Sequence, residues 1–210
     1  MYPLAPATYD RTLTEIASKE KNPVPLTTLD TQTALIIVDL QKGIVSSRFI
    51  HPIDDVVKRS RFLIDTFRTQ GLPVVLVNVV GGAPGRTEQP PRQRILLEGW
   101  TDLIPELGHQ PGDIVVTKRT WGAFASTDLE AQLKAKGVTQ VVITGVATGT
   151  GVEATARQAY EAGLNVTHAT DAMTDVRPEA HEYSLKYVFP RLGETGSTQD
   201  LLYLLAKRSA

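Results

Sequence analysis

The sequence predicts an α/β protein of three layers, in which helices cover both faces of a central parallel sheet of about five or six strands. Two observations lead to this prediction. Short apolar runs rich in β-branched residues recur along the chain, and most are followed by a segment with helical spacing. Strands that alternate with helices form parallel sheets with right-handed crossovers, and ligands bind beyond the carboxyl ends of such strands.

Residues 1–32 are predicted to form an N-terminal arm that lies across the body of the protein or a neighbouring subunit. Prolines recur in this arm, and a short segment over 11–19 has helical character. Residues 33–210 are predicted to form one domain, because no internal repeat or low-complexity linker divides them and their length is sufficient to bury one core.

The first two predicted strands enclose a helix. The continuous apolar run 34–38 is typical of a strand buried on both faces, and it ends in Asp39. Apolar residues recur near helical spacing over 54–71, and a glycine stops the helix there. Residues 73–80 then form the second strand.

A surface loop and a third strand follow. Glycine and proline surround Arg86 within 81–93, so this stretch predicts irregular structure. The run 114–118 predicts a strand that ends in Lys118, and a helix follows over 126–136.

The last part of the chain contains a fourth strand over 138–145, a helix over 154–162 and a fifth strand over 164–170. Two further helices follow, with a short strand or loop at 193–195 between them. Asp171, Asp175 and Glu153 are interpreted as helix caps or surface groups.

Small residues dominate the turn between the fourth strand and its helix, residues 145–151. Backbone N–H groups at a helix N-terminus can receive an anion or a polarised oxygen. The alternative is a tight connection that needs glycine for steric reasons only.

The composition favours a small-molecule partner. A net charge of -1 gives no basic excess for nucleic acid or an anionic membrane surface. The absence of cysteine excludes disulfides, cysteine-bound zinc and thiol catalysis. No uncharged apolar run reaches the roughly 18 residues of a membrane span, and the polar N-terminus is unlike a signal peptide, so the expected location is cytoplasmic. The histidines are scattered, and we expect no metal and no cofactor.

Three features end predicted strands at the edge where ligands bind: Asp39, Lys118 and the turn 145–151. A carboxylate beside an apolar strand suits proton transfer, although an aspartate in this position taken alone is more often a cap for the following turn. Lys118 could pair with Asp39 and neutralise negative charge on a substrate, or it could be a solvated strand end. Together the three features suit hydrolysis.

At these residues the sequence resembles the isochorismatase-like hydrolases, which include isochorismatases, nicotinamidases and N-carbamoylsarcosine amidases. The resemblance covers about residues 33–190 through three ordered motifs, ALIIVDLQKGI, VVTKRTWGAFASTDLE and ITGVATGTGVEATARQAYEAG. It implies a Rossmann-like fold and a cis peptide bond at Val146–Ala147. In the family's cysteine hydrolases the third motif carries the nucleophile where this chain has Gly151.

The branch of the family that works without cysteine is the isochorismatases, which resemble this chain in having glycine at the Gly151 position and which cleave a vinyl ether. The resemblance therefore implies three catalytic positions, Asp39, Lys118 and Gly151. Protonated Asp39 would protonate the enol-ether carbon, and water would attack the resulting oxocarbenium ion. Lys118 and the N–H groups near Gly151 would hold a substrate oxygen or carboxylate.

Five residues are predicted to bind substrate: Asn78, Arg86, Trp121, Val146 and Ala147. Arg86 is favoured over two other loop arginines by its glycine- and proline-rich surroundings, and Trp121 is expected to form an aromatic pocket wall. The chain departs from isochorismatases, which commonly have an aromatic residue at the Ala147 position and a glutamine near Asn78.

Two alternatives to an active cysteine-independent hydrolase stay open. The chain could be a catalytically silent family member that binds a small metabolite or a protein partner, or Gly151 could replace a native cysteine. The resemblance and the proline-rich arm also predict a homo-oligomer, either a dimer or a tetramer.

Overall fold

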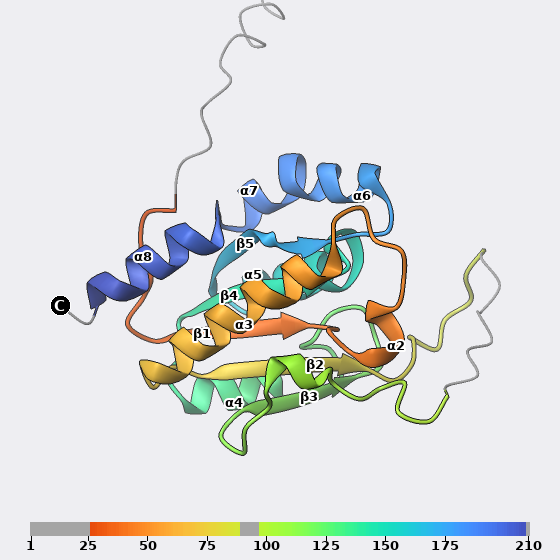
Figure 1. The fold of residues 1–210 in the computed structure, drawn as a ribbon, viewed down its shortest axis with the longest axis horizontal. Coiled ribbons are helices and arrows are strands. Elements are labelled where there is room, and N and C mark those ends of the chain that lie inside the picture. Colours follow the sequence, from red (N-terminus) through yellow and green to blue (C-terminus); the bar gives the residue numbers. More distant parts are fainter. Residues whose placement is uncertain (1–25, 89–96, 209–210) are drawn as a thin grey trace, which may run out of the picture.

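A computed structural model describes residues 26–88 and 97–208 of the chain. Within these residues one parallel sheet of six strands, in the order β3-β2-β1-β4-β5-β6, lies between two layers of helices (Figure 1). This confirms the predicted three-layer α/β architecture. The strands are β1 (Thr33–Val38), β2 (Val74–Val79), β3 (Ile114–Lys118), β4 (Gln140–Val146), β5 (Asn165–Thr174) and β6 (Glu194–Gly196). The α-helices are α2 (Lys42–Val45), α3 (Ile53–Thr69), α4 (Leu129–Ala135), α5 (Glu153–Glu161), α6 (Pro178–Tyr183), α7 (Phe189–Leu192) and α8 (Thr198–Arg208), with a 3-10 turn at Pro105–Leu107 and π-helical turns at Thr148–Val152 and Ser184–Val188.

Strand β1 is buried along its whole length, as its unbroken apolar run predicts. Side chains alternate across a strand, so Leu35 and Ile37 belong to one core cluster and Ile36 and Val38 to the other. Burial of each such side chain contributes about 1.5–3 kcal/mol. The strand therefore gives a rigid support to Asp39, which follows it.

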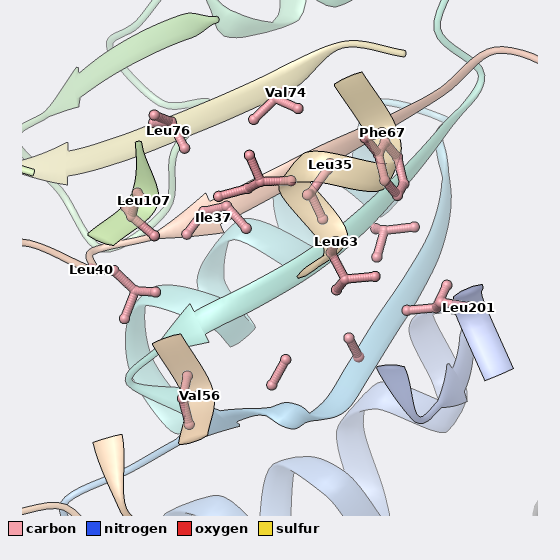
Figure 2. Packing of buried hydrophobic residues seen from close by; sticks show 14 of the residues in the cluster. Leu35, Ile37, Leu40, Val56, Leu63, Phe67, Val74, Leu76, Leu107 and Leu201 are labelled. Atoms are coloured by element: carbon pink, nitrogen blue, oxygen red, sulfur yellow. The ribbon is translucent and has the colours of Figure 1, made fainter. Parts of the chain in front are cut away.

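Helix α3 covers one face of the sheet. Its residues Val56, Leu63 and Phe67 are buried in the same cluster as Leu35 and Ile37 of β1, and Leu63 and Phe67 lie beside Leu35 (Figure 2). Val56, Leu63 and Phe67 recur at helical spacing and form the apolar stripe that the sequence predicts. Helix α8 adds Leu201 and Leu205 to the same cluster.

Helices α4 and α5 cover the opposite face. Leu129 and Leu133 of α4 are buried there, and α5 contributes Ala156 and Ala159. Because alanine is small, α5 lies close to the sheet, and the turn that precedes α5 is held near the ends of β1 and β4.

The chain order of the strands reverses between β1 and β4. From β1 the chain proceeds through β2 to β3, and it then returns to place β4 on the other side of β1. Ligands of open parallel sheets bind at such a reversal, outside the carboxyl ends of the strands. This position brings the end of β1 and the end of β4 together.

Gly145 allows the close approach of these two strands. It has φ +108, and a Cβ built on it would lie 2.2 Å from the backbone oxygen of Val38. Only glycine fits there, because a side chain would overlap the neighbouring strand.

Gly145→Ala is expected to lower the free energy of unfolding by about 2–3 kcal/mol, since the added Cβ must push β4 away from β1. Urea denaturation measures the change. Gly137→Ala is the matched control: Gly137 also has positive φ, at +67, but a Cβ there meets nothing within 4 Å. A cost that does not exceed the control would contradict the steric explanation.

Several boundaries differ from the prediction. Strand β5 extends to Thr174 instead of ending at 170, because it contains a bulge. Ile143 of β4 pairs with His168 and Gly145 pairs with Met173, so two residues along β4 correspond to five along β5. The short last strand exists as β6. The loop after β2 is irregular over 81–88, as predicted.

The predicted arm is only partly described. Residues 1–25 lie outside the described part of the chain, and so does the short helix expected over 11–19. Leu26 and Leu29 are buried in the α3-side cluster, and Thr27 hydrogen-bonds to Glu194 through its N–H at 3.1 Å. The end of the arm therefore packs on the body, while the domain boundary at 32 and the dimer or tetramer stay predictions.

Across residues 26–88 and 97–208, the structure contains no helix that is long and apolar enough to cross a membrane.

Candidate active site

Asp39 and Lys118 form a buried ion pair at the carboxyl edge of the sheet. Lys118 Nζ lies 2.8 Å from Asp39 Oδ2, and the two side chains are 1% and 8% exposed, respectively. Lys118 Nζ also donates a hydrogen bond of 2.6 Å to the backbone carbonyl of Trp121. The contact between these residues that the sequence predicts is therefore present.

The sheet explains how two residues so far apart in sequence meet. Strand β2 lies between β1 and β3, so Asp39 and Lys118 start about 10 Å apart at the usual strand spacing. The long lysine side chain spans this distance along the α4 and α5 side of the sheet. Asp39 turns out of β1 with φ 54, and its N–H still donates to Val77 on β2 at 2.9 Å.

Gly151 faces this ion pair from the turn after β4. A Cβ built on Gly151 would lie 3.0 Å from Asp39 Oδ2 and 3.1 Å from both the Val146 carbonyl oxygen and Val38 Cγ1. A side chain at position 151 would therefore point at the carboxylate, and its neighbours would have to shift by a few tenths of an ångström. The cis peptide bond that the resemblance implies is present at Val146–Ala147.

The turn itself forms a π-helical start to α5. Ala147 O accepts hydrogen bonds from the N–H groups of Thr150, at 3.1 Å, and Val152, at 3.2 Å. The Gly149 N–H donates to Asp175 Oδ2 at 2.8 Å. The prediction of bare N–H groups is thus wrong for these three, because the turn and a neighbouring carboxylate already satisfy them.

Asp175 is a site residue that the sequence analysis missed. The interpretation of Asp175 as a surface group is wrong, since the residue is 1% exposed, whereas the interpretation as a cap is confirmed, since its carboxylate accepts the Gly149 N–H of the turn and the Arg177 N–H before α6. Asp171 does cap a helix, accepting from the N–H and hydroxyl of Thr198 at the start of α8. Asp175 follows the end of a strand as Asp39 does, but the bulge in β5 concealed that strand end in the sequence.

Two histidines lie on the same side of the turn. His181 Nδ1 is 2.8 Å from the Thr148 hydroxyl, and the His51 ring contacts the His181 ring edge-on at 5.0 Å between centroids. The pKa of His181 lies below its ordinary value because the ring is buried and because His51 is adjacent, while Asp175 and Glu182 act in the opposite direction. Neutral imidazole is therefore favoured beside the turn.

The predicted substrate-binding residues do not all gather at one point. Val146 and Ala147 belong to the turn, buried and half-buried respectively. Asn78 Nδ2 donates to Thr101 O at 2.8 Å. The Trp121 side chain is 69% exposed, and the hydrogen bond with Lys118 is made by the Trp121 carbonyl oxygen, not by the indole. Arg86 is exposed in the loop after β2. Their roles in binding stay predictions.

In the described residues, no group of three or more histidine, cysteine, aspartate or glutamate side chains is placed to hold a metal ion. The groups that the structure does bring together at the site are the Asp39 carboxyl group, the Lys118 ammonium group and the backbone of the turn.

The fold and this site together define a class, a hydrolase built on a parallel α/β sheet, with a buried acid and lysine at the strand ends. The isochorismatase domain model matches residues 33–200, and the chain belongs to the isochorismatase family.

Relatives from several bacteria share the whole domain. The isochorismatase family protein YwoC of Bacillus subtilis (strain 168), itself uncharacterised, is 41% identical over 181 residues, which are 81% of this chain and 93% of YwoC. YecD of Escherichia coli O157:H7, also uncharacterised, is 38% identical and is covered over 96% of its length, against 82% of this chain. A solved isochorismatase family structure from Burkholderia thailandensis has a TM-score of 0.82 at 39% identity and covers 85% of this chain and 98% of its own.

More distant relatives carry names of different activities. They include an isochorismatase, a ureidoacrylate amidohydrolase and a nicotinamidase, at 27–31% identity.

Proposed function

We propose that the protein is a cysteine-independent hydrolase that cleaves the vinyl ether of isochorismate or of a related small carboxylate. The observation that carries the proposal is the contact between Gly151 and Asp39: where a thiol would point at the carboxylate, the chain has no side chain. Amide hydrolysis through a thioester needs a thiolate, and the sequence contains no cysteine. Vinyl ether hydrolysis needs no covalent intermediate. It needs an acid and a water molecule.

Asp39 is the acid in this proposal. Its carboxyl proton moves to the terminal carbon of the vinyl ether, which converts that carbon to a methyl group and leaves an oxocarbenium ion. Water adds to the oxocarbenium carbon and returns a proton to the Asp39 carboxylate. The resulting hemiketal then passes its hydroxyl proton to the ether oxygen as the bond between the hemiketal carbon and that oxygen breaks, which releases pyruvate and an alcohol.

Lys118 adjusts the charge of Asp39 through this cycle. Its ammonium, 2.8 Å away, stabilises the carboxylate that remains after proton transfer. A substrate carboxylate bound near Lys118 adds a second negative charge, and this favours the protonated form of Asp39 before the reaction. A bound anionic substrate therefore favours the state of the pair in which Asp39 can donate a proton.

The relatives support this reaction class in part. An isochorismatase of Bacillus subtilis is 27% identical over 183 residues, and the enterobactin synthase component B of Escherichia coli (strain K12) is 29% identical over 187 residues. The amidohydrolase and nicotinamidase relatives are comparably distant, so the choice between the activities rests on the missing thiol.

Asp39→Asn is expected to lower kcat for pyruvate release from isochorismate by about 10²–10⁴-fold, because the amide cannot supply the proton. Pyruvate is followed by a coupled dehydrogenase assay. Asp54→Asn is the control, since Asp54 is an exposed carboxylate in the first turn of α3 and should leave the rate unchanged. Full activity of Asp39→Asn would rule out its role as the acid.

The absence of a thiol also allows a second candidate, a catalytically silent family member that binds a metabolite. Such a protein would be stabilised against heat by a metabolite yet release no product, and Asp39→Asn would retain the stabilisation.

The remaining alternative is that Gly151 replaces a native cysteine. Gly151→Cys is assayed on a panel of amide substrates, and amidase activity gained by this variant would indicate that a cysteine belongs at position 151.

A further inference from the structure

The turn that faces Asp39 is supported from behind by residues that take no part in the proposed chemistry. Asp175, at the end of β5, accepts the Gly149 N–H at 2.8 Å through Oδ2 and the Arg177 N–H at 3.0 Å through Oδ1. Its carboxylate therefore links the turn to the segment that leads into α6. Hydrogen bonds to a charged acceptor are stronger than neutral ones, and the Asp175 side chain that accepts these two is buried.

A second link joins the turn to α6 itself. The Thr148 hydroxyl lies 2.8 Å from His181 Nδ1, and both residues are buried. A Cβ on Gly149 would lie 2.9 Å from the Cβ of Ala180, so α6 packs directly on the backbone of the turn. The turn thus has contact with α6 through one hydrogen bond and through close packing.

The loop between α2 and α3 completes the support. The Ile50 N–H donates to the backbone oxygen of Asp175 at 2.9 Å, and the His51 N–H donates to the Thr174 hydroxyl at 3.3 Å. The His51 ring lies against His181. Asp175 and α6 therefore contact the turn directly, and the loop between α2 and α3 holds Asp175 and His181 in place.

We propose that Asp175, Thr148 and His181 are positioning residues, which hold the turn so that Gly151 stays against Asp39 and substrate is presented to the acid. This inference rests on the proposed function for its kinetic consequences. Asp175 also has an electrostatic effect. Its carboxylate already accepts the Gly149 N–H, and its negative charge disfavours the binding of an anion at that N–H group. Lys118 is then the group that receives the anionic part of the substrate.

The effect of losing this support should be on kcat. A Cβ built on Gly151 would lie 3.0 Å from Asp39 Oδ2, so the turn borders the acid closely. A small displacement of the turn therefore alters the alignment of the reacting carbon with Asp39. A misplacement of about 1 Å can cost about 10²-fold in rate. Substrate binding through Lys118 does not depend on these residues, and KM should change little.

Thr148→Val tests the hydrogen bond to His181 with almost no change in shape. We expect kcat for pyruvate release to fall about tenfold with KM within about twofold of wild type. Thr148→Ser retains the hydroxyl and should restore most of the rate. Equal losses in the valine and serine variants would indicate a packing role and overturn the proposal.

Asp175 is tested by a second matched pair. Asp175→Asn retains an acceptor oxygen for the Gly149 N–H, whereas Asp175→Ala removes it. Amide hydrogen exchange reports the support without any substrate: exchange at Gly149 should be faster in Asp175→Ala, and close to wild type in Asp175→Asn. Wild-type protection of Gly149 in Asp175→Ala would overturn the proposed support.

The two measurements, kcat for pyruvate release and amide hydrogen exchange, separate this inference from the proposed function. If wild type releases no pyruvate from isochorismate, the proposed function fails, and the exchange measurements on Asp175→Ala and Thr148→Val still decide whether the turn is held as described. If wild type is active but both variants match it in kcat and in exchange, the positioning role is overturned while the function stands.

Discussion

Lys118→Met is expected to lower the free energy of unfolding by about 3–5 kcal/mol, because it deprives the buried Asp39 carboxylate of its cation. Methionine has a similar length and fills the space, so the cost comes from the charge rather than from a cavity. The Trp121 carbonyl also loses its donor. The same change should abolish pyruvate release, since Asp39 then lacks the ammonium that stabilises its carboxylate after proton transfer.

Urea denaturation with each single variant and the double variant Asp39→Asn with Lys118→Met isolates the interaction. The double variant should recover much of the loss, because no buried charge remains without its partner. Lys134→Met is the surface control: Lys134 pairs with Glu130 at 2.6 Å on the exposed face of α4, and such pairs contribute about 0.3–0.5 kcal/mol. A cost for Lys118→Met no larger than this control would show that the pair is not electrostatically coupled.

His168 should make the protein less stable in acid. Its ring is fully buried in β5, stacked on Phe189 at 4.0 Å, and Nδ1 lies 3.3 Å from the Glu194 carbonyl oxygen. In the described residues, Nε2 has no hydrogen-bond partner. Burial lowers the pKa of His168 to about 4, against a smaller opposing effect of the hydrogen bond to Glu194.

The sign of the pH effect follows from proton binding. Between about pH 6.5 and pH 4 the unfolded chain protonates this histidine, whereas the folded protein does not. The stabilisation is thus fully present above pH 6.5 and is lost as the pH falls toward 4. The loss amounts to about 3 kcal/mol at the lower end. His181, whose pKa is also lowered, adds to the effect in the same direction.

Free energies of unfolding at about pH 7 and about pH 4.5 measure this dependence by linear extrapolation in urea. His168→Gln does not titrate and should show a clearly smaller loss on acidification, although it is less stable at neutral pH. His109→Gln, at an exposed position, should follow wild type. An acid dependence identical in His168→Gln and wild type would exclude His168 as its source.

The sequence predicted the bounds of a strand best where the local apolar pattern alone set them. The strand Ile114–Lys118 has the predicted bounds because its apolar run stops at a charged residue and residues typical of turns precede it. The strand at β5 was less predictable, because a bulge depends on the pairing with β4 and leaves no mark in the local pattern. Asp175 was missed for this reason.

By itself, the sequence determined the three-layer parallel architecture, the strand-end positions of Asp39 and Lys118, and the absence of a thiol. These are consequences of periodicity and composition, which are local. Only the tertiary structure decided that Lys118 reaches across β2 to Asp39, that Gly151 faces the pair, and that Asp175 and His181 hold the turn. Those contacts join residues far apart in the chain, and they exist only once the strand order places β1 between β2 and β4.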